Sequence, residues 1–290
     1  MSRALRPGQR CEVWVACVTT GARELIFASN DVLLEAPNWT QDDTALILNG
    51  AGSLWRLDLS SRSPELIPLT GVPGLNNDHV LAPAGDQIYL SADDGRLYRA
   101  PTRGGAADRI TAPDGFSYFL HGVSPDGEEL ACVGVEGGDF TVPGLLMTIP
   151  AAGGRPATIS TGGGHWDGPE YSPDGAWIYL NTEAFSSRPG HAQIARVRRD
   201  GSGLERLVSS DTVDWFPHLS PDGHRASYLR FPAGTLGHPA DLPVDVVAVS
   251  LKDWATPLHT WAVPGGQGTL NVNSWSPDSS RFAYVAYPVR

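Results

Sequence analysis

Four histidines at related positions in a repeating pattern are the strongest indication of chemistry in this chain. Each precedes a short polar turn that recurs along the sequence, and the turn's second residue follows three to eight positions later: His79, His121, His165 and His218. Neutral imidazoles that converge with carboxylates bind ions such as zinc or manganese. The four are therefore the candidate ligands of one divalent metal ion (Mn, Zn or Ca), and no motif indicates an organic cofactor.

The same histidines could also move protons. An imidazole or a carboxylate in a sheltered cleft exchanges protons with a substrate. Glu170 occupies in its own repeat the place that His218 occupies in the next, so the candidate catalytic residues are His121, His218 and Glu170. Any one histidine at such a position is also well explained as a hydrogen-bonded structural residue, so the interpretation depends on their joint placement.

Two short segments combine aromatic rings with acids just before a turn: residues 164–170, Gly-His-Trp-Asp-Gly-Pro-Glu, and residues 214–218, Asp-Trp-Phe-Pro-His. An aromatic face covers the C–H groups of a sugar ring while polar side chains bind its hydroxyls. The alternative is that both tryptophans fill the gap between neighbouring repeats. With amides from residues 265–273 and one loop histidine, the candidate substrate-binding residues are Trp166, Asp167, Trp215, His238, Gln267, Asn271 and Asn273.

The repeated turn specifies the elements that must position these side chains. Its full copies read Ser-Pro-Asp-Gly, at 124–127, 172–175 and 220–223, and degraded copies place the second residue at 41, 83 and 277. Proline fixes its own φ, and Ser and Asp bond nearby backbone, which suits a type I turn between two strands. Successive copies are 42, 42, 48, 48 and 56 residues apart, and periods of this size are typical of propeller blades or solenoid repeats.

Each repeat offers four short runs of β-type residues. In one repeat they are 118–124, 129–135, 145–150 and 156–160, and no helical periodicity competes with them. The sequence therefore predicts an all-β fold, a six-bladed β-propeller of four-stranded antiparallel blades that forms a single domain over residues 1–290.

The two ends of the chain supply the closure of the ring. The last repeat has only two runs, 270–275 and 282–287, whereas 11–18 and 24–29 precede the first full repeat. Pairing these halves would remove the open edges that a linear array of sheets exposes. We expect the last blade to be closed by the N-terminal hairpin.

Long connections gather on one side of the predicted ring. The segments 136–144, 183–191 and 230–243 all join the second strand of a blade to the third, opposite the face of the short turns. The predicted entries to the inner strands, which carry the four histidines, lie on the same side. Because connections beyond minimal length tend to be functional, we expect the site at this end of the central channel.

The repeats of this chain resemble those of a known family. Residues 171–175 (Tyr-Ser-Pro-Asp-Gly) followed by 177–180 (Trp-Ile-Tyr-Leu), and 275–279 (Trp-Ser-Pro-Asp-Ser) followed by 282–285 (Phe-Ala-Tyr-Val), resemble the repeats of TolB-like six-bladed β-propellers. The resemblance covers nearly the whole chain. It is specific for the fold but not for function, because such propellers include periplasmic scaffolds, peptidase gating domains and polysaccharide lyases.

One segment is similar to part of the oligogalacturonate lyases. In residues 265–273, Gly-Gly-Gln-Gly-Thr-Leu-Asn-Val-Asn, Gln267 matches a glutamine that holds manganese in those enzymes together with two histidines, which are replaced here. The resemblance thus implies that any metal would lie nearer the four histidines named above.

Composition narrows the partners. The formal net charge is -11, without a run of Lys or Arg, so neither nucleic acid nor an anionic membrane is an expected partner. No apolar stretch is long enough to span a bilayer, and residues 1–9 lack the pattern of a secretion signal. We expect a cytoplasmic protein whose partner is a small molecule or oligosaccharide, with a protein partner as the alternative.

Two functions compete at the sequence level. The first is binding of a small molecule, a carbohydrate above all, at a histidine-rich channel mouth, with metal-assisted lyase, epimerase or hydrolase chemistry; in the lyase version His121 or His218 removes a proton next to a carboxylate that the metal neutralises. The alternative is a non-catalytic protein-binding scaffold of the TolB-like type, whose rigid blades leave the loops free to vary. A purely structural repeat protein is the third possibility.

Overall fold

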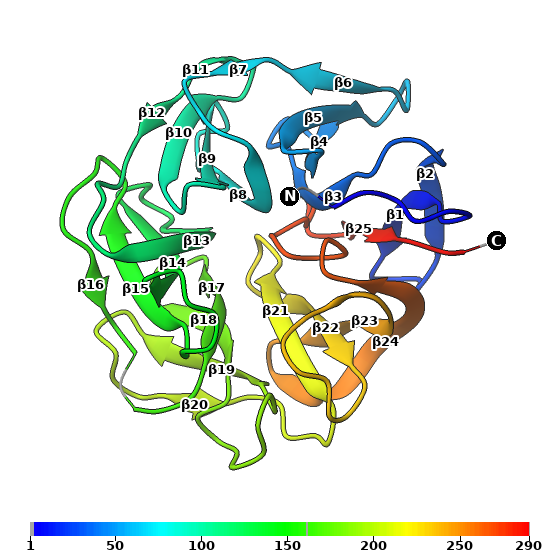
Figure 1. The fold of residues 1–290 in the computed structure, drawn as a ribbon. Helices are drawn as coiled ribbons and strands as arrows, with labels where there is room; N and C mark the ends of the chain where they lie inside the picture. Colours follow the sequence, from blue (N-terminus) through cyan, green and yellow to red (C-terminus); the bar gives the residue numbers. More distant parts are fainter. Residues whose placement is uncertain (1–2, 161, 290) are drawn as a thin grey trace.

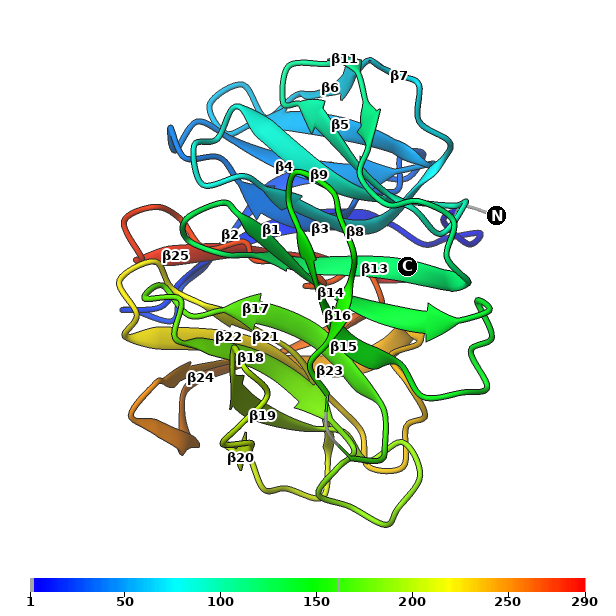
Figure 2. The ribbon, with the colours of Figure 1, turned by 90° about the vertical axis from the view of Figure 1, so that its left-hand side faces the viewer.

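Six blades surround a central channel in the computed structural model, which describes residues 3–160 and 162–289 (Figure 1). The blades are antiparallel sheets of four strands, as the repeat predicts, with the innermost segment of the sixth joined by an isolated bridge, and the described residues contain no helix. Among them there is accordingly no helix that could cross a membrane. Figure 2, turned by 90°, shows the third and fourth blades from the side.

Five blades are built from consecutive strands. A short parallel pair, β7 (Leu69–Thr70) with β11 (Gly105–Ala106), links the outer parts of the first two blades. From the channel outward, the first blade has β3 (Glu35–Trp39), β4 (Ala45–Gly50), β5 (Ser53–Asp58) and β6 (Pro64–Ile67), and the second has β8 (Leu75–Leu81), β9 (Gln87–Ala92), β10 (Leu97–Pro101) and β12 (Asp108–Arg109). The third has β13 (Phe116–Val123), β14 (Glu129–Glu136), β15 (Leu145–Pro150) and β16 (Ala157–Thr158), and the fourth has β17 (Trp166–Tyr171), β18 (Trp177–Thr182), β19 (Gln193–Arg198) and β20 (Glu205–Arg206). The fifth has β21 (Val213–Leu219), β22 (Arg225–Phe231), β23 (Ala240–Ser250) and β24 (Asp253–Gly266).

The sixth blade joins the two ends of the chain, which confirms the predicted closure. Strand β1 (Cys11–Cys17) lies between β2 (Arg23–Ser29) and β25 (Arg281–Ala286), and it pairs antiparallel with both. The innermost position is taken by the segment that ends at Trp275, which bridges to Phe282. Because β1 and β25 come from opposite ends of the sequence, their hydrogen bonds close the ring.

The repeated turn has the geometry that its residues predict. In the copy at 124–127, the Gly127 N–H donates to the Ser124 carbonyl at 2.8 Å, and the Ser124 hydroxyl accepts from the Glu129 N–H at 2.9 Å. Gly127 has a φ of 74°, a left-handed value that glycine adopts without strain. These local bonds explain why the motif marks the turn between the first and second strands of a blade so reliably.

Each complete blade has a β-bulge in its inner strand. An extra residue in one strand bends it and changes the direction of the side chains that follow. Phe216, within one bulge, has a φ of 57°, a costly value for a bulky residue. The bulges fall between Glu35 and Asn38, Leu75 and His79, Leu120 and Gly122, Asp167 and Glu170, and Trp215 and His218.

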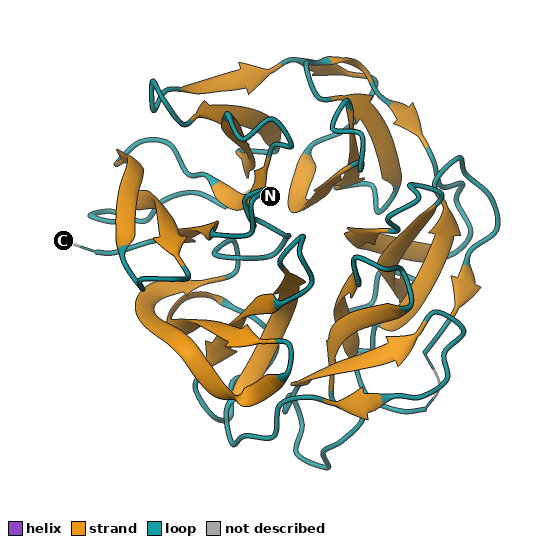
Figure 3. Cartoon of the chain, turned by 180° about the vertical axis from the view of Figure 1, so that it is seen from behind, coloured by secondary structure: helices purple, strands orange, loops and turns teal. Residues whose placement is uncertain are grey.

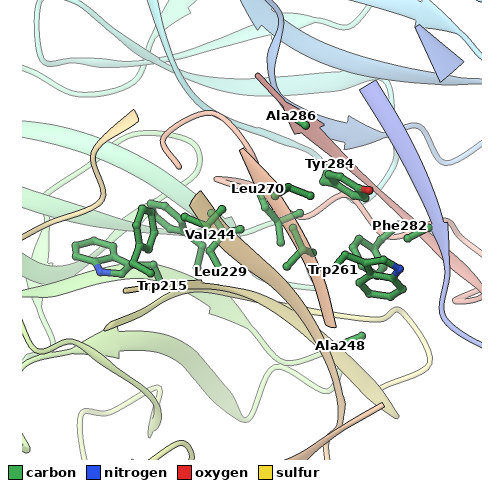
Figure 4. Close-up of a cluster of buried hydrophobic side chains, with 14 of the residues drawn as sticks. Trp215, Leu229, Val244, Ala248, Trp261, Leu270, Phe282, Tyr284 and Ala286 are labelled. Atoms are coloured by element: carbon green, nitrogen blue, oxygen red, sulfur yellow. The ribbon is translucent and has the colours of Figure 1, made fainter. Parts of the chain in front are cut away.

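Apolar side chains fill the spaces between blades. Figure 4 shows the cluster between the fifth and sixth blades, where Trp261 of one sheet packs against Phe282 of the other, with ring centroids 5.6 Å apart. Figure 3 shows from the opposite side how loops connect the strands around the ring. Stacked sheets with such cores make a rigid frame, so the residues at the strand entries have fixed positions.

Candidate functional site

A cavity of about 740 Å³ opens at the end of the channel where the long loops gather. We call it the mouth cavity. Its floor comes from the entries of the inner strands and its rim from the loops 137–144 and 232–239. The lining residues are Asn76, Asn77, Asp78, Phe119, His121, Val133, Val135, Phe140, Thr141, Val142, Pro143, His165, Asp167, Glu183, Trp215, Leu236, Gly237, His238, Pro239, Ala240 and Gln267.

Asp167 is the centre of the floor. Its Oδ1 lies 3.2 Å from His121 Nε2 and accepts the Gly168 N–H at 2.7 Å, and its Oδ2 lies 2.9 Å from His165 Nε2. His238 Nε2 is 4.0 Å from the same Oδ2. Burial by itself would raise the pKa of Asp167, but the hydrogen bonds from His121 and His165 hold the pKa well below its ordinary value. Asp167 is therefore an anion that organises three histidines.

His121 is held in its protonated form. Its Nε2 faces Asp167, and its Nδ1 lies 3.1 Å from the backbone oxygen of Asn271. An imidazole can donate from both nitrogens only when it is charged. Burial acts to lower the pKa of His121, but the Asp78 and Asp167 carboxylates outweigh it and raise the pKa to about 9. At neutral pH this ring is a buried cation with both protons in use.

Asp78 has a carboxylate oxygen in the floor that no described residue bonds, although its side chain also has a hydrogen bond with Asn271. Only 6% of the residue is exposed, and its Oδ1 has no hydrogen-bond partner among the described residues. Burial raises the pKa of Asp78 to about 6, against the attraction of the His121 ring. A carboxylate with an unused oxygen at this depth costs free energy, and a ligand that donates a proton to it would recover that cost.

His165 and His238 complete the wall. The Gly144 N–H donates to His165 Nδ1 at 2.8 Å, which requires that nitrogen to be unprotonated. Burial acts to lower the pKa of His165, yet its bond to Asp167 raises it; since the Gly144 bond fixes the tautomer, we describe the ring as neutral with its proton on Nε2. His238 packs on Trp215, with ring centroids 4.4 Å apart.

The amides predicted to bind substrate form a support behind the cavity. Gln267 lines the cavity and donates from Nε2 to Asn77 Oδ1 at 3.0 Å, while its Oε1 accepts from Asn271 Nδ2 at 3.2 Å and contacts His238 Nδ1. Asn271 itself is fully buried. It therefore acts through Gln267 and His121 and does not line the cavity.

Three of the predicted site residues, His218, Glu170 and Asn273, lie outside the mouth cavity. His218 places Nδ1 2.6 Å from Glu170 Oε2 and Nε2 3.0 Å from the Leu270 backbone oxygen. Glu170 Oε1 also accepts from the Leu219 N–H at 2.8 Å and from Asn273 Nδ2 at 2.7 Å. None of the three lines the mouth cavity, because the bulges turn His218 and Glu170 toward each other, between the fourth and fifth blades. Only His121 of the proposed catalytic set faces the mouth.

His79 is separated from the other histidines. It is 1% exposed, its Nε2 lies 3.4 Å from the Ile47 backbone oxygen, and its Nδ1 has no partner among the described residues. Burial lowers the pKa of His79 to about 4. The ring is a neutral residue between the first and second blades.

We predict that His79 makes the protein sensitive to acid. Because its folded pKa is depressed, its contribution to stability is present above pH 6.5 and is lost as pH falls toward 4. His79→Leu should raise the free energy of unfolding at pH 5 by about 2 kcal/mol over the wild type and change it little at pH 7.5. Urea denaturation at the two pH values measures this, and an unchanged pH dependence in the variant would contradict it.

The two candidate tryptophans point to different sides of their strands, because successive side chains of a strand alternate between its two faces. Trp166 is fully buried in the core between the third and fourth blades, so it is not available as a sugar platform. Trp215 lines the mouth cavity, but His238 covers its ring. Asp167, next to Trp166 in sequence, points to the channel.

The proposed metal ligands do not fit a metal ion as arranged. His121 and His165 direct Nε2 at Asp167, His218 is bound to Glu170, and His79 is isolated. Within residues 3–160 and 162–289, no group of three or more His, Cys, Asp or Glu side chains has the geometry to hold a metal ion.

Several residues of the cavity escaped prediction. Asp78 and Asn77 directly precede His79, and the bulge between Leu75 and His79 brings the acid and the amide into the mouth in place of the histidine. Phe140 and Leu236 lie in two of the long segments already identified as functional. A large apolar side chain in each of these loops is the sequence feature that could have identified both residues.

A smaller cavity of about 290 Å³ lies on the face of the short turns. It is lined by Glu170, Asn273 and residues of the turns, and His121 lines both cavities. His121 thus stands between the two ends of the channel.

Comparison with known proteins places the fold. No protein-family model matches the chain. The chain is 39% identical over 261 residues to the uncharacterized protein Atu1656 of Agrobacterium fabrum, an alignment that covers 88% of this chain and 85% of that protein. A solved structure from Agrobacterium tumefaciens that carries the provisional name TolB is 34% identical, with a TM-score of 0.86 over 97% of this chain and 99% of the other.

More distant structures share the fold alone. TolB from Acinetobacter baumannii is 17% identical, with a TM-score of 0.65 over 89% of this chain and 64% of that one. An oligogalacturonate lyase in complex with manganese is 16% identical, with a TM-score of 0.59 over 97% of this chain and 78% of that enzyme.

Proposed function

This chain belongs to the TolB-like family of six-bladed β-propellers, and we propose from that premise that the mouth cavity binds a small ligand. The fold does not specify the ligand, so the proposal depends on the site. The observation that carries it is the Asp78 carboxylate, buried in the floor of the cavity with an oxygen that has no hydrogen-bond partner among the described residues.

The size and the lining of the cavity support this function. A volume of about 740 Å³ lies within the range of about 300–1,000 Å³ common for small-molecule sites. The polar groups gather in the floor, where Asp78, Asp167 and Gln267 are fixed by neighbouring blades. The rim is apolar, and such a combination binds a ligand with one polar end.

Lyase chemistry on an acidic sugar receives less support from the site. Its substrate carries a carboxylate, which would meet Asp78 and Asp167 in the floor. Among the described residues that line the cavity, the charged donor is His121, whose two ring protons are already bonded to Asp167 and Asn271. A neutral sugar remains compatible with the cavity, because its hydroxyls could donate to Asp78.

A short protein segment is the second candidate occupant. The side chains of Phe140 and Leu236 are 76% and 69% exposed at the rim, and Val142 lies beside them. Exposed apolar groups that border a cavity are typical of interaction sites. A segment that inserts into the mouth would cover them, which keeps the scaffold function as an alternative.

We predict that Asp78→Asn removes ligand binding without harming the fold. A thermal-shift screen of small molecules should find compounds that raise the melting temperature of the wild type, with a stabilisation of about 2.7 kcal/mol at 100 times the dissociation constant. The same compounds should bind the variant at least about tenfold more weakly, a loss of about 1.4 kcal/mol. The unliganded variant should still fold, because asparagine has the size of aspartate and its side-chain oxygen can still accept the hydrogen bond from Asn271.

The matched control is Asp31→Asn, which removes one negative charge from an exposed position. It should behave as the wild type with every compound. If compounds stabilise Asp78→Asn and the wild type equally, or if none stabilises the wild type, the mouth cavity is not the proposed site.

A further inference from the structure

The charges that line the mouth cavity are unbalanced. Three carboxylates lie along it, those of Asp78, Asp167 and Glu183, and none of its described lining residues is Lys or Arg. The one fixed positive charge is His121, which uses one proton on Asp167 and the other on the Asn271 backbone oxygen. The pairing of His121 with Asp167 leaves Asp78 without a cation that bonds to it.

We infer that the ligand of the mouth cavity is an organic cation, with an ammonium or guanidinium group for the Asp78 carboxylate and an apolar body for the rim. This inference rests on the proposed binding function and names the chemical class of its ligand. A charged donor is the partner that a buried carboxylate lacks, and charge-assisted hydrogen bonds are about twice as strong as neutral ones.

The surroundings of Asp78 favour a cation over a neutral donor. Asp167 is an anion in the same floor and Glu183 lies at the edge, so the field of the cavity is negative beyond Asp78 itself. In a partly enclosed cleft with apolar walls, such a field is focused and raises the local concentration of cations. The net charge of -11 acts in the same direction over the whole surface.

The apolar side chains at the rim are the reason why the ligand should have an apolar body. Phe140 and Val142 come from the loop after β14, and Leu236 comes from the loop after β22, so two loops present apolar groups across the opening. The ring of Phe119 lies against that of Phe140, with centroids 5.6 Å apart. A ligand whose charged end reaches the floor would leave its other end among these side chains, where burial of apolar surface stabilises it.

Three probes that share a phenylethyl group and differ in the charge of the end group test the inference: 2-phenylethylamine, 2-phenylethanol and 3-phenylpropionate. Their dissociation constants for the full-length protein are measured by titration calorimetry or ligand-observed NMR at pH 7.5 and low salt. We expect the amine to bind at least about tenfold more tightly than the alcohol, and the carboxylate to bind most weakly.

Variants separate a specific site from general attraction to an acidic protein. Asp78→Asn should remove the advantage of the amine over the alcohol, Glu183→Gln should reduce it less, and the exposed control Asp31→Asn should leave it unchanged. Binding of the alcohol or the carboxylate as tight as that of the amine would overturn the cation inference while leaving the mouth a ligand site. An advantage that persists in Asp78→Asn would also overturn it, and failure of all three probes to bind saturably would contradict both the inference and the proposed function.

Discussion

His218→Ala should lower the free energy of unfolding by about 3–5 kcal/mol, the cost expected when one partner of a buried ionisable pair is removed. His218 is fully buried, and its two ring nitrogens contact Glu170 Oε2 and the Leu270 backbone oxygen. Removal of the ring leaves the Glu170 carboxylate with the Leu219 N–H and the Asn273 amide alone. Urea denaturation at pH 7.5 measures the loss.

Conservative variants distinguish a structural role from a catalytic one. His218→Gln keeps a donor at the site, and Glu170→Gln keeps an acceptor for the Leu219 N–H, so each should cost less than His218→Ala. Both should bind ligands of the mouth cavity as the wild type does, because neither residue lines it. A variant that folds with wild-type stability but loses ligand binding or an enzymatic activity would show that the pair belongs to the site after all.

The stability of the protein should fall as pH rises from 6.5 to 9, with His121 as a major cause. Its folded pKa is raised to about 9, whereas the unfolded side chain titrates near 6.5, so its contribution is full below pH 6.5 and is lost as pH rises through 9. A rise of this size corresponds to about 3 kcal/mol. Denaturant unfolding of the wild type across this range measures the slope.

His121→Gln isolates this contribution from the other titrating groups. The lowered pKa of Cys17 acts in the opposite direction, and this group remains in the variant. The difference between wild type and variant should therefore be largest at pH 6.5 and shrink toward pH 9. A difference that stays constant across the range would mean that His121 is neutral in the folded protein.

The fold could be predicted because its signals are local. The turn at 124–127 and its copies fix their own conformation through bonds between neighbouring residues, and their spacing identifies blades. Closure by the N-terminal hairpin followed from counting strands at the two ends. The same reasoning placed the long loops on one side of the ring, where the mouth cavity opens.

The site could be predicted only in part, because single residues depend on the pleat and on the bulges. His121, His165 and Asp167 meet in the mouth cavity, which His238 and Gln267 also line, as the gathering of polar residues on one face suggested. Trp166 is buried between blades whereas Asp167 lines the cavity, because successive side chains of a strand point to opposite faces.

The bulges explain the remaining differences. One extra residue between Asp167 and Glu170, and another between Trp215 and His218, turn the later residue away from the mouth. A third bulge brings Asp78 into the cavity and leaves His79 between blades. A repeat pattern alone does not show where an inner strand will bulge, so these positions could not be assigned from spacing.

The crystal structure of the protein with 2-phenylethylamine tests the central claim most directly. The account predicts density in the mouth cavity, with the ammonium nitrogen within hydrogen-bond distance of the Asp78 carboxylate and the phenyl ring between Phe140 and Leu236. Density for the amine only in the small cavity on the face of the short turns, or only at exposed carboxylates such as Asp31, would contradict it.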